Sequence, residues 1–279
     1  MTEAPQIATA DALRSAPEEF QTACKKIVIS HAINELYGSR VFDEPAIALA
    51  PTPYAKWLIC RVAMEEYGHH WRFFELGREM GIPAEKMLPE KTSKKPLNIF
   101  ALPLESWEQF CVIKAIGDLA EILQVEDLIH CTFLPLRNLA RMTMPEERFH
   151  SEFGIEMCED IVEKQGAGAK PKLQRYVNQL FPEMVKFFGS ADSKNNAIYR
   201  KWGIKKRSNE EMRADYIRRA KELVEGRFGL KLPAVNRRPI ARLVRRQTPV
   251  SDFLVIYFLG DRDKLAAVNL QEGIIGRAA

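Results

Sequence analysis

Two five-residue stretches decide the fold of this chain: Glu65-Glu66-Tyr67-Gly68-His69 and Glu146-Glu147-Arg148-Phe149-His150, both of the pattern E-E-x-x-H. Each lies among apolar residues with helical spacing, and a separation of three residues puts the second glutamate and the histidine on one helix face. Each helix therefore offers one carboxylate and one imidazole from adjacent turns. A single pair is a weak signal because helices are rich in Glu, but two pairs 81 residues apart indicate a shared metal site.

One further carboxylate upstream of each pair completes a set of six. Glu35 lies 31 residues before the second glutamate of the first motif, and Asp118, Glu121 and Glu126 lie 29, 26 and 21 residues before that of the second. Two matching hairpins should place their ligands at one level, so we select Asp118, whose offset is nearest to 31. Two helices with E-x-x-H and two with one carboxylate each are the ligand set of a di-iron carboxylate site. Oxygen ligands with two imidazoles favour iron or manganese over zinc or copper, and the vacant positions would bind O₂. The predicted ligands are Glu35, Glu66, His69, Asp118, Glu147 and His150.

The pattern around these residues is all-α, since Gly 15 and Pro 16 in 279 residues are too few for a chain of short strands. A capping box of Ser15 and Glu18 predicts the start of the first helix and Gly38 its end. Thr52-Pro53 predicts the start of the second, which ends before Gly81. Pro145 either kinks the fourth helix or starts a separate piece. The four long helices are expected at residues 16–38, 53–80, 103–128 and 133–164.

Two hairpins joined by one longer crossover are typical of a four-helix bundle. Beyond the bundle, we expect further helices at 172–188, interrupted at Pro182, and at 209–228, followed by a tail rich in Pro and Arg from residue 232. The predicted organisation is a bundle over residues 1–190 and a helical C-terminal extension over residues 191–279, packed on the bundle.

Composition excludes several other classes of protein. Lys+Arg 41 against Asp+Glu 37, with both signs interspersed, lacks the concentrated basic stripe of a nucleic-acid-binding surface. Five cysteines without C-x-x-C suggest neither a disulfide framework nor a thiolate zinc site, which favours a cytoplasmic location. The N-terminal residues do not resemble a secretory signal, and no apolar run is long enough to span a membrane. The most apolar window, residues 110–128, nevertheless contains five charged residues.

The motifs and several other stretches, which together cover about residues 25–205, make the chain resemble a known family. It is similar to the ferritin-like di-iron epoxidases of the phenylacetic acid catabolic family, which act on phenylacetyl-CoA, and more distantly to benzoyl-CoA epoxidase. The further matching stretches are His31-Ala32-Ile33-Asn34-Glu35, Asn98-Ile99-Phe100 with Ser106-Trp107, residues 112–118, and Phe181-Pro182 with Phe187-Phe188-Gly189.

The resemblance implies a ferritin-like fold and a monooxygenase that epoxidises the ring of an aromatic acyl-CoA in aromatic catabolism. It also implies electrons from an NAD(P)H-dependent flavin and iron–sulfur reductase, a ferritin-like structural partner subunit, and an oligomer. The third-helix ligand of that family is an aspartate at the position of Asp118, in agreement with the spacing argument.

Roles for individual residues follow from this ligand set. We expect Glu66 and Glu147 to be the bridging, catalytic carboxylates and the other four ligands to cap the two metal ions. Glu65 and Glu146 are each placed to accept the second N–H of the opposing histidine, with a solvated helix edge as the alternative. His31 lies one turn before Glu35 on the same helix face and is a candidate for a residue that contacts a metal ligand without binding metal itself. His70 is expected to be structural and His130 to have no role.

Basic residues in the C-terminal half are candidates for contacts with the phosphates of CoA. One group is Lys201, Lys205, Lys206 and Arg207, and the other is Arg237, Arg238, Arg242, Arg245 and Arg246. For either group, a solvated surface or a subunit contact is the alternative.

Three other functions remain open at this point. The chain could be an oxygenase or oxidase that acts alone on a substrate without CoA, on which the sequence is silent. It could be an iron-oxidising or storage ferritin, although about 90 residues beyond the bundle argue against it. It could be the non-catalytic structural subunit of an epoxidase, but such a subunit loses ligands that this chain retains.

Overall fold

The computed structural model describes residues 6–89 and 97–235. Within them the chain forms helices and no strand, with one isolated backbone bridge between Ile7 and Phe133. The predicted all-α class is therefore confirmed. The α-helices are α1 (Ala10–Leu13), α2 (Glu18–Gly38), α3 (Glu44–Leu49), α4 (Pro53–Glu79), α5 (Trp107–Val112), α6 (Asp118–Leu128), α7 (Leu134–Gln165), α8 (Lys170–Lys186), α9 (Lys194–Lys201) and α10 (Asn209–Lys221). The π-helical segments are η1 (Ser39–Asp43), η4 (Ile113–Gly117) and η6 (Glu222–Arg227), and the 3₁₀ segments are η2 (Ala84–Met87), η3 (Asn98–Ala101) and η5 (Gly166–Gly168).

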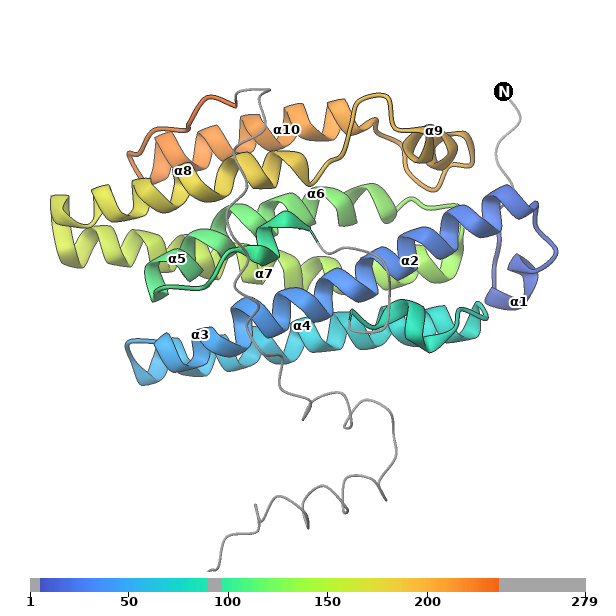
Figure 1. Cartoon of the computed structure of the whole chain (residues 1–279), viewed down its shortest axis with the longest axis horizontal. Coiled ribbons are helices and arrows are strands. Elements are labelled where there is room, and N and C mark those ends of the chain that lie inside the picture. Colours follow the sequence, from blue (N-terminus) through green and yellow to red (C-terminus); the bar gives the residue numbers. More distant parts are fainter. Residues whose placement is uncertain (1–5, 90–96, 236–279) are drawn as a thin grey trace, which may run out of the picture. The chain divides into compact units, whose positions relative to one another are not determined.

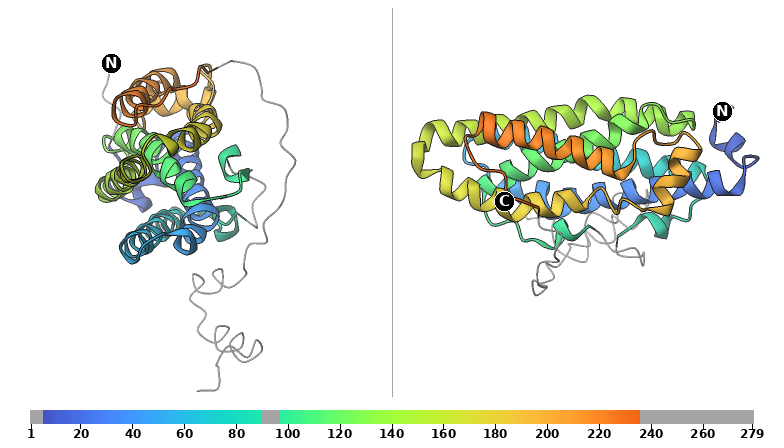
Figure 2. Two further views of the ribbon diagram at one scale, coloured as in Figure 1. Left: turned by 90° about the vertical axis from the view of Figure 1, so that its left-hand side faces the viewer. Right: turned by 90° about the horizontal axis from the view of Figure 1, so that it is seen from above.

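Two hairpins of long helices form the bundle (Figures 1 and 2). In the first hairpin α2 packs along α4, and in the second the line formed by α5, η4 and α6 packs along α7. The segment from α4 to α5 is the longer crossover, and α4 and α7 bring the two hairpins into contact. α8 and α10 lie over the second hairpin, and α9 contacts α2.

Buried apolar side chains form two clusters along the bundle. Phe110, Phe153 and Tyr216 belong to the cluster where α5, α7, α8 and α10 meet. Phe20 and Phe73 belong to the cluster that joins α1, α2 and α4 to the start of α7. Each fully buried aromatic side chain contributes about 2 to 3 kcal/mol to folding, so these clusters hold the helix positions on which the site depends.

Helix ends follow the sequence signals in part. The Thr52 hydroxyl accepts a hydrogen bond from the Ala55 N–H at 3.1 Å, and Gly81, at φ +71°, follows the end of α4. The capping-box prediction was wrong, because the N-cap position of α2 is Pro17, without a side-chain cap bond, and the residues before it form α1 and a turn. α2 ends at Gly38 as predicted, but Gly38 has the helical φ of −57° and the chain continues as π-helix η1 into α3.

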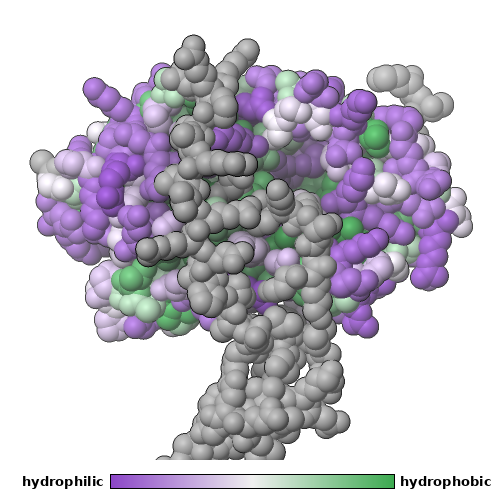
Figure 3. All heavy atoms as spheres, in the orientation of Figure 1, coloured by the Kyte–Doolittle hydropathy of each residue, from purple (hydrophilic) through white to green (hydrophobic). Residues whose placement is uncertain are grey.

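Other features complete the comparison with the sequence. α7 runs through Pro145 as one helix, so Pro145 does not start a separate piece. α9 was not predicted. The arginine cluster at residues 237–246 lies outside the described residues. Hydrophilic side chains cover most of the described surface seen in Figure 3. No helix of the described residues is long and apolar enough to cross a membrane.

Candidate metal centre

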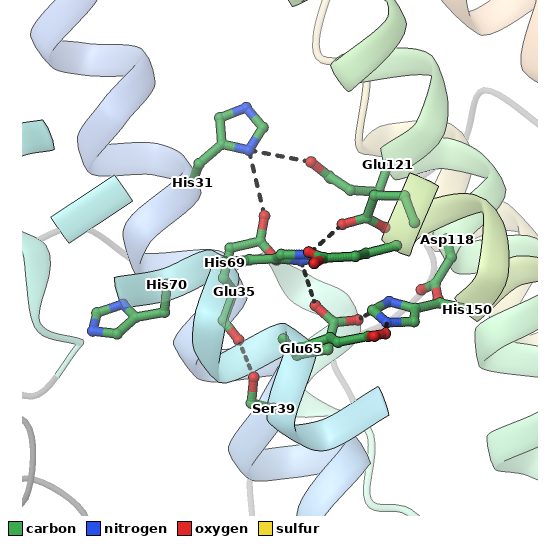
Figure 4. Close-up of polar contacts among 12 residues, drawn as sticks. His31, Glu35, Ser39, Glu65, His69, His70, Asp118, Glu121 and His150 are labelled. Carbon is green, nitrogen blue, oxygen red and sulfur yellow. Dashed lines mark hydrogen bonds and ion pairs between the residues drawn. The ribbon is translucent and has the colours of Figure 1, made fainter. Parts of the chain in front are cut away.

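The six predicted ligands come together inside the bundle (Figure 4). They form two overlapping groups, and within each group the ligand atoms lie within 4.8 Å of one another. The Glu35 half consists of Glu35, Glu66, His69 and Glu147, and the Asp118 half consists of Glu66, Asp118, Glu147 and His150. Glu66 and Glu147 belong to both halves, which is the arrangement that bridging carboxylates require.

The local backbone explains how the third helix supplies its ligand. A π turn accommodates one extra residue and often marks a functional site. η4 interrupts the predicted third helix at Ile113–Gly117, and Asp118 is the first residue of α6 directly after it. η1 interrupts the α2–α3 line in the same way and ends at Asp43.

Carboxylates on the opposite helices orient both histidines. His69 Nε2 lies 2.8 Å from Glu146 Oε2, and His150 Nε2 lies 2.9 Å from Glu65 Oε2. These are the cross-pairs that the sequence predicted for Glu65 and Glu146. Burial alone would raise the pKa of Glu146, but hydrogen bonds from His69 and Arg72 lower it to about 2. Because this carboxylate stays ionised, it accepts a hydrogen bond from Nε2–H of His69, and Nδ1 then faces the ligand cluster.

The Nδ1 atoms of His69 and His150 point into the cluster and lie close to glutamate oxygens. Each such pair of atoms needs a proton or a metal ion between them. His69 Nδ1 lies 3.0 Å from Glu147 Oε1, and His150 Nδ1 lies 3.1 Å from Glu66 Oε1. His69 Nδ1, Glu147 Oε1 and His150 Nδ1 are buried and make no hydrogen bond. Burial lowers the pKa of His150, but the charge of Glu66 and the bond to Glu65 raise it to about 9. A proton or a metal ion must therefore neutralise these carboxylates, and the donor set of buried oxygens and imidazoles fits a metal ion.

A buried lysine, which the sequence analysis did not single out, lies in the Asp118 half. Lys114 Nζ is 2.6 Å from Glu66 Oε1, 2.8 Å from Asp118 Oδ2 and 3.4 Å from Asp43 Oδ1. Burial would lower the pKa of Lys114, but the charges of Asp118, Asp43 and Glu66 raise it well above its ordinary value. The sequence offers one signal for Lys114, which is its position four residues before Asp118 inside an apolar window. It offers no comparable signal for Asp43.

His31 lies behind the Glu35 half. Its Nδ1 is 3.5 Å from Glu35 Oε1 and 3.1 Å from Glu121 Oε1, and its ring stacks on Phe73. Burial lowers the pKa of His31, but the charge of Glu121 and hydrogen bonds to Glu121 and Glu35 raise it to about 9. Burial raises the pKa of Glu35 to about 8, although the bond from His31 opposes this. Glu121, the rejected alternative to Asp118, thus lies outside both halves, in a third group with His31 and Glu35 whose ligand atoms also lie within 4.8 Å of one another.

Other candidates lie away from the cluster. His70 Nδ1 bonds to the carbonyl of Ala32 at 2.7 Å, which agrees with the structural role expected for it. His130 is exposed. Glu126 accepts two bonds of 3.0 Å from Arg219, so this charge in the apolar window fastens α10 to α6.

Of the four basic residues at positions 201–207 proposed for CoA phosphates, Lys201 is exposed and pairs with Glu19, and the other three differ in their surroundings. Lys205 is buried and bonded to Gln124. Arg207 binds Asp127 at 3.3 Å and the carbonyl of Leu123 at 2.6 Å. Lys206 is exposed, so it is the one of the three whose side chain lies at the surface.

A cavity of about 270 Å³ adjoins the cluster. Glu35, Glu66, Asp118 and Glu147 form part of its wall together with Lys114. The apolar part of the rest comes from η1, η3, η4 and the C-terminal end of α8, and includes Phe42, Ile99, Phe100, Ile113, Met184 and Phe187. Polar side chains also line the cavity, namely Asn34, Asp43, Glu121, Glu183 and Lys186. An apolar cavity of about 150 Å³ suffices to bind benzene, so this one has room for an aromatic ring next to the ligands.

Comparisons with known proteins agree with this geometry. A family model described as phenylacetic acid catabolic protein matches residues 2–240. The chain is 27% identical over 224 residues to the A subunit of 1,2-phenylacetyl-CoA epoxidase from Escherichia coli, covering 78% of this chain and 71% of that one. It is 25% identical over 233 residues to benzoyl-CoA oxygenase component B from Aromatoleum evansii. That match covers 74% of this chain and 49% of the relative, so the chain spans about half the length of that protein.

Proposed function

Because the chain belongs to the phenylacetic acid catabolic protein family, we propose that it is the metal-binding oxygenase subunit of an enzyme that epoxidises an aromatic acyl-CoA such as phenylacetyl-CoA. The observation that carries this proposal is the buried pair of overlapping ligand groups beside a cavity large enough for an aromatic ring. One oxygen atom of O₂ enters the ring, and the other leaves as water with two electrons and two protons from a reductant.

Glu35, Glu66, His69, Asp118, Glu147 and His150 would hold two iron or manganese ions. When bound, the two metal ions would supply the redox chemistry that activates O₂. Glu65 and Glu146 keep the imidazoles of His150 and His69 turned toward the ions. The buried atoms without hydrogen bonds support this assignment, since a buried polar group without a partner is costly.

The apolar wall of the cavity would hold the aromatic ring. Phe42 and Phe100 lie with ring centroids 5.8 Å apart on this wall, and Phe187 lines it from α8. Such a wall orients a flat ring beside the carboxylates and excludes water from it. For the CoA phosphates, Lys206 and the arginines at residues 237–246 remain the candidates.

The names of both relatives support partner proteins. One relative is the A subunit of its enzyme, and the other is component B, so each is a part of a larger enzyme. We propose that this chain likewise takes electrons from an NAD(P)H-dependent flavin and iron–sulfur reductase and works with a ferritin-like structural subunit.

Metal analysis after anaerobic loading with Fe²⁺ tests the proposal. We expect about two irons per chain, the content of a di-iron carboxylate site, and loss of at least one in His69→Ala and in His150→Ala. His70→Ala, one residue away but hydrogen-bonded to the backbone, is the matched control and should keep both. Full iron content in both histidine variants would contradict the ligand assignment.

Turnover tests the substrate separately. The loaded chain, with its co-purifying partner and a reductant, should transfer one ¹⁸O atom from ¹⁸O₂ to phenylacetyl-CoA or benzoyl-CoA. If iron is bound but neither thioester binds or reacts, the metal assignment stands and the substrate is one without CoA.

A further inference from the structure

The two halves of the cluster differ in the cationic groups that lie beside their carboxylates: a lysine ammonium group is inserted into the Asp118 half. Lys114 Nζ contacts Asp118 and Oε1 of Glu66, the oxygen that lies beside His150 of the same half. The other oxygen of the shared Glu66, Oε2, lies beside His69 of the Glu35 half. Glu35 and Glu147 lie beside imidazoles instead: Glu35 is 3.5 Å from His31 Nδ1 and 3.9 Å from His69 Nδ1, and Glu147 is 3.0 Å from His69 Nδ1.

From this asymmetry we propose that Lys114 is a resident cation that occupies the Asp118 half until the second metal ion displaces it, so that the two ions load in order. The first ion enters the Glu35 half. The second ion must displace the ammonium group from Glu66 and Asp118, and it therefore binds more weakly. This inference rests on the proposed metal-binding function and concerns how the same site is filled.

The negative charge of the surrounding carboxylates explains what Lys114 contributes at this position. Glu35, Asp43, Glu66, Asp118 and Glu147 bring five buried or nearly buried carboxyl groups together. Without metal, carboxylates at this density repel one another and lack the hydration that would stabilise them. The ammonium group of Lys114 contacts three of them and so keeps the helices that carry the ligands close together before a metal ion binds.

The displaced ammonium group has a counter-ion to move to. Asp43 belongs to neither half, is 3% exposed, and its Oδ1 makes no hydrogen bond although it lies 3.4 Å from Lys114 Nζ. A small movement of the lysine side chain toward Asp43 would free Glu66 and Asp118 without exposing an unpaired charge. Asp43 is thus a positioning residue for Lys114.

Close packing restricts this movement to the side chain. A Cβ atom on Gly154 of α7 would lie 2.4 Å from the Ala115 nitrogen and 2.7 Å from the Lys114 carbonyl carbon. The backbone of η4 therefore rests directly on α7, and the lysine side chain with its flexible stem is the part that can shift.

An anaerobic Mn²⁺ titration at one fixed pH, followed by electron paramagnetic resonance, measures both steps without turnover. The signal of free Mn²⁺ disappears on binding, and two adjacent bound ions give an exchange-coupled signal distinct from one isolated ion. We expect the full-length wild type to bind two ions in separate steps, with the coupled signal absent until the second step.

Two variants with opposite expected effects make the test specific. Lys114→Gln should tighten the second step by about tenfold or more, within the usual range of coupling between two binding events, and merge the two steps. Asp43→Asn should weaken the second step by a similar factor, because the displaced ammonium group loses its counter-ion. Lys114→Arg keeps the charge and is the matched control, for which the steps should stay apart.

The outcomes separate the two proposals. If the wild type binds no Mn²⁺ and no Fe²⁺, the metal-binding function itself is wrong. If it binds two ions but Lys114→Gln leaves the second step unchanged or weakens it, the resident-cation inference is overturned and the metal site stands. If Lys114→Gln does not fold, Asp43→Asn decides: an unchanged or tighter second step overturns the inference.

Discussion

Asp118 and Glu121 lie one turn apart on α6, yet their carboxylates have different neighbours. Asp118 belongs to a group of four ligands, whereas Glu121 bonds to His31 outside both halves. Asp118→Asn should therefore lower the bound metal from two ions toward one, while the matched change Glu121→Gln should leave both in place. Metal analysis of the two purified variants gives the answer, and the reverse order of metal content would identify Glu121 as the ligand.

His70 should make the metal-free protein sensitive to acid. Burial lowers the pKa of His70 to about 4, so the folded protein binds its proton less well than the unfolded chain, whose value is near 6.5. The stability that neutral His70 contributes is complete above pH 6.5 and is lost as the pH falls toward 4. Between pH 7 and 5, wild type should lose about 2 kcal/mol of unfolding free energy relative to His70→Asn. Denaturant titrations at both pH values measure this difference, and parallel pH profiles would contradict it.

At the residue scale, spacing on a regular helix predicted which carboxylates and imidazoles would lie together, but not the charged groups between them. Glu66, His69, Glu147 and His150 lie on the uninterrupted helices α4 and α7, where a separation of three residues places two side chains on one face. Lys114 and Asp43 lie in π segments, where that rule does not hold. Their shared position depends on contacts between distant segments, which sequence spacing does not contain.

α7 and η4 approach each other so closely that the contact requires a glycine at position 154. Gly154→Ala would place a Cβ against the backbone of residues 114 and 115, so we expect a loss of about 1 to 3 kcal/mol in unfolding free energy or a failure to fold. Gly68→Ala on α4 is the matched control, because its nearest neighbour is the Arg72 side chain at 3.8 Å. That variant should gain up to about 1 kcal/mol from helix propensity. Denaturant unfolding of both proteins checks the prediction, and a neutral Gly154→Ala would show that the helices can move apart.

At the element scale, the sequence predicted the start of α4 but not the start of α2, and it did not predict that the chain stays helical beyond Gly38. Thr52 and Pro53 act within one turn, so the start of α4 follows from the sequence. Gly38 has the φ of an ordinary helical residue, and Phe100 packs 3.4 Å from the position of its absent Cβ. A glycine needed for close packing resembles a glycine that ends a helix until the neighbouring segment is known.

For the whole molecule, the cluster joins helices from both hairpins, so a bound ion should stabilise the entire bundle. Ligand that binds only the folded state adds about 2.7 kcal/mol at a concentration one hundred times its dissociation constant. Adding Mn²⁺ or Fe²⁺ should therefore raise the melting temperature of the metal-free wild type. In Glu66→Gln, which alters a ligand of both halves, most of this increase should disappear.

The exposed residue Glu156 on α7 offers the control for that measurement. Glu156→Gln removes one carboxylate from the same helix without touching the cluster, so its melting temperature should respond to metal as the wild type does. An equal response of Glu66→Gln to the ions would mean that they bind elsewhere on the protein.

The π segments at residues 39–43 and 113–117 have a consequence for how the lengths of related chains can change. A π turn is an α-helical turn with one residue inserted, and one codon is enough to create or remove it. Removing one residue from η4 would restore a regular helix and rotate Trp107–Val112 by about 100° relative to Asp118. Relatives that lack such a turn should therefore differ from this chain by single-residue gaps at these two places. Such gaps should be absent from α4 and α7, where they would separate each glutamate from its histidine.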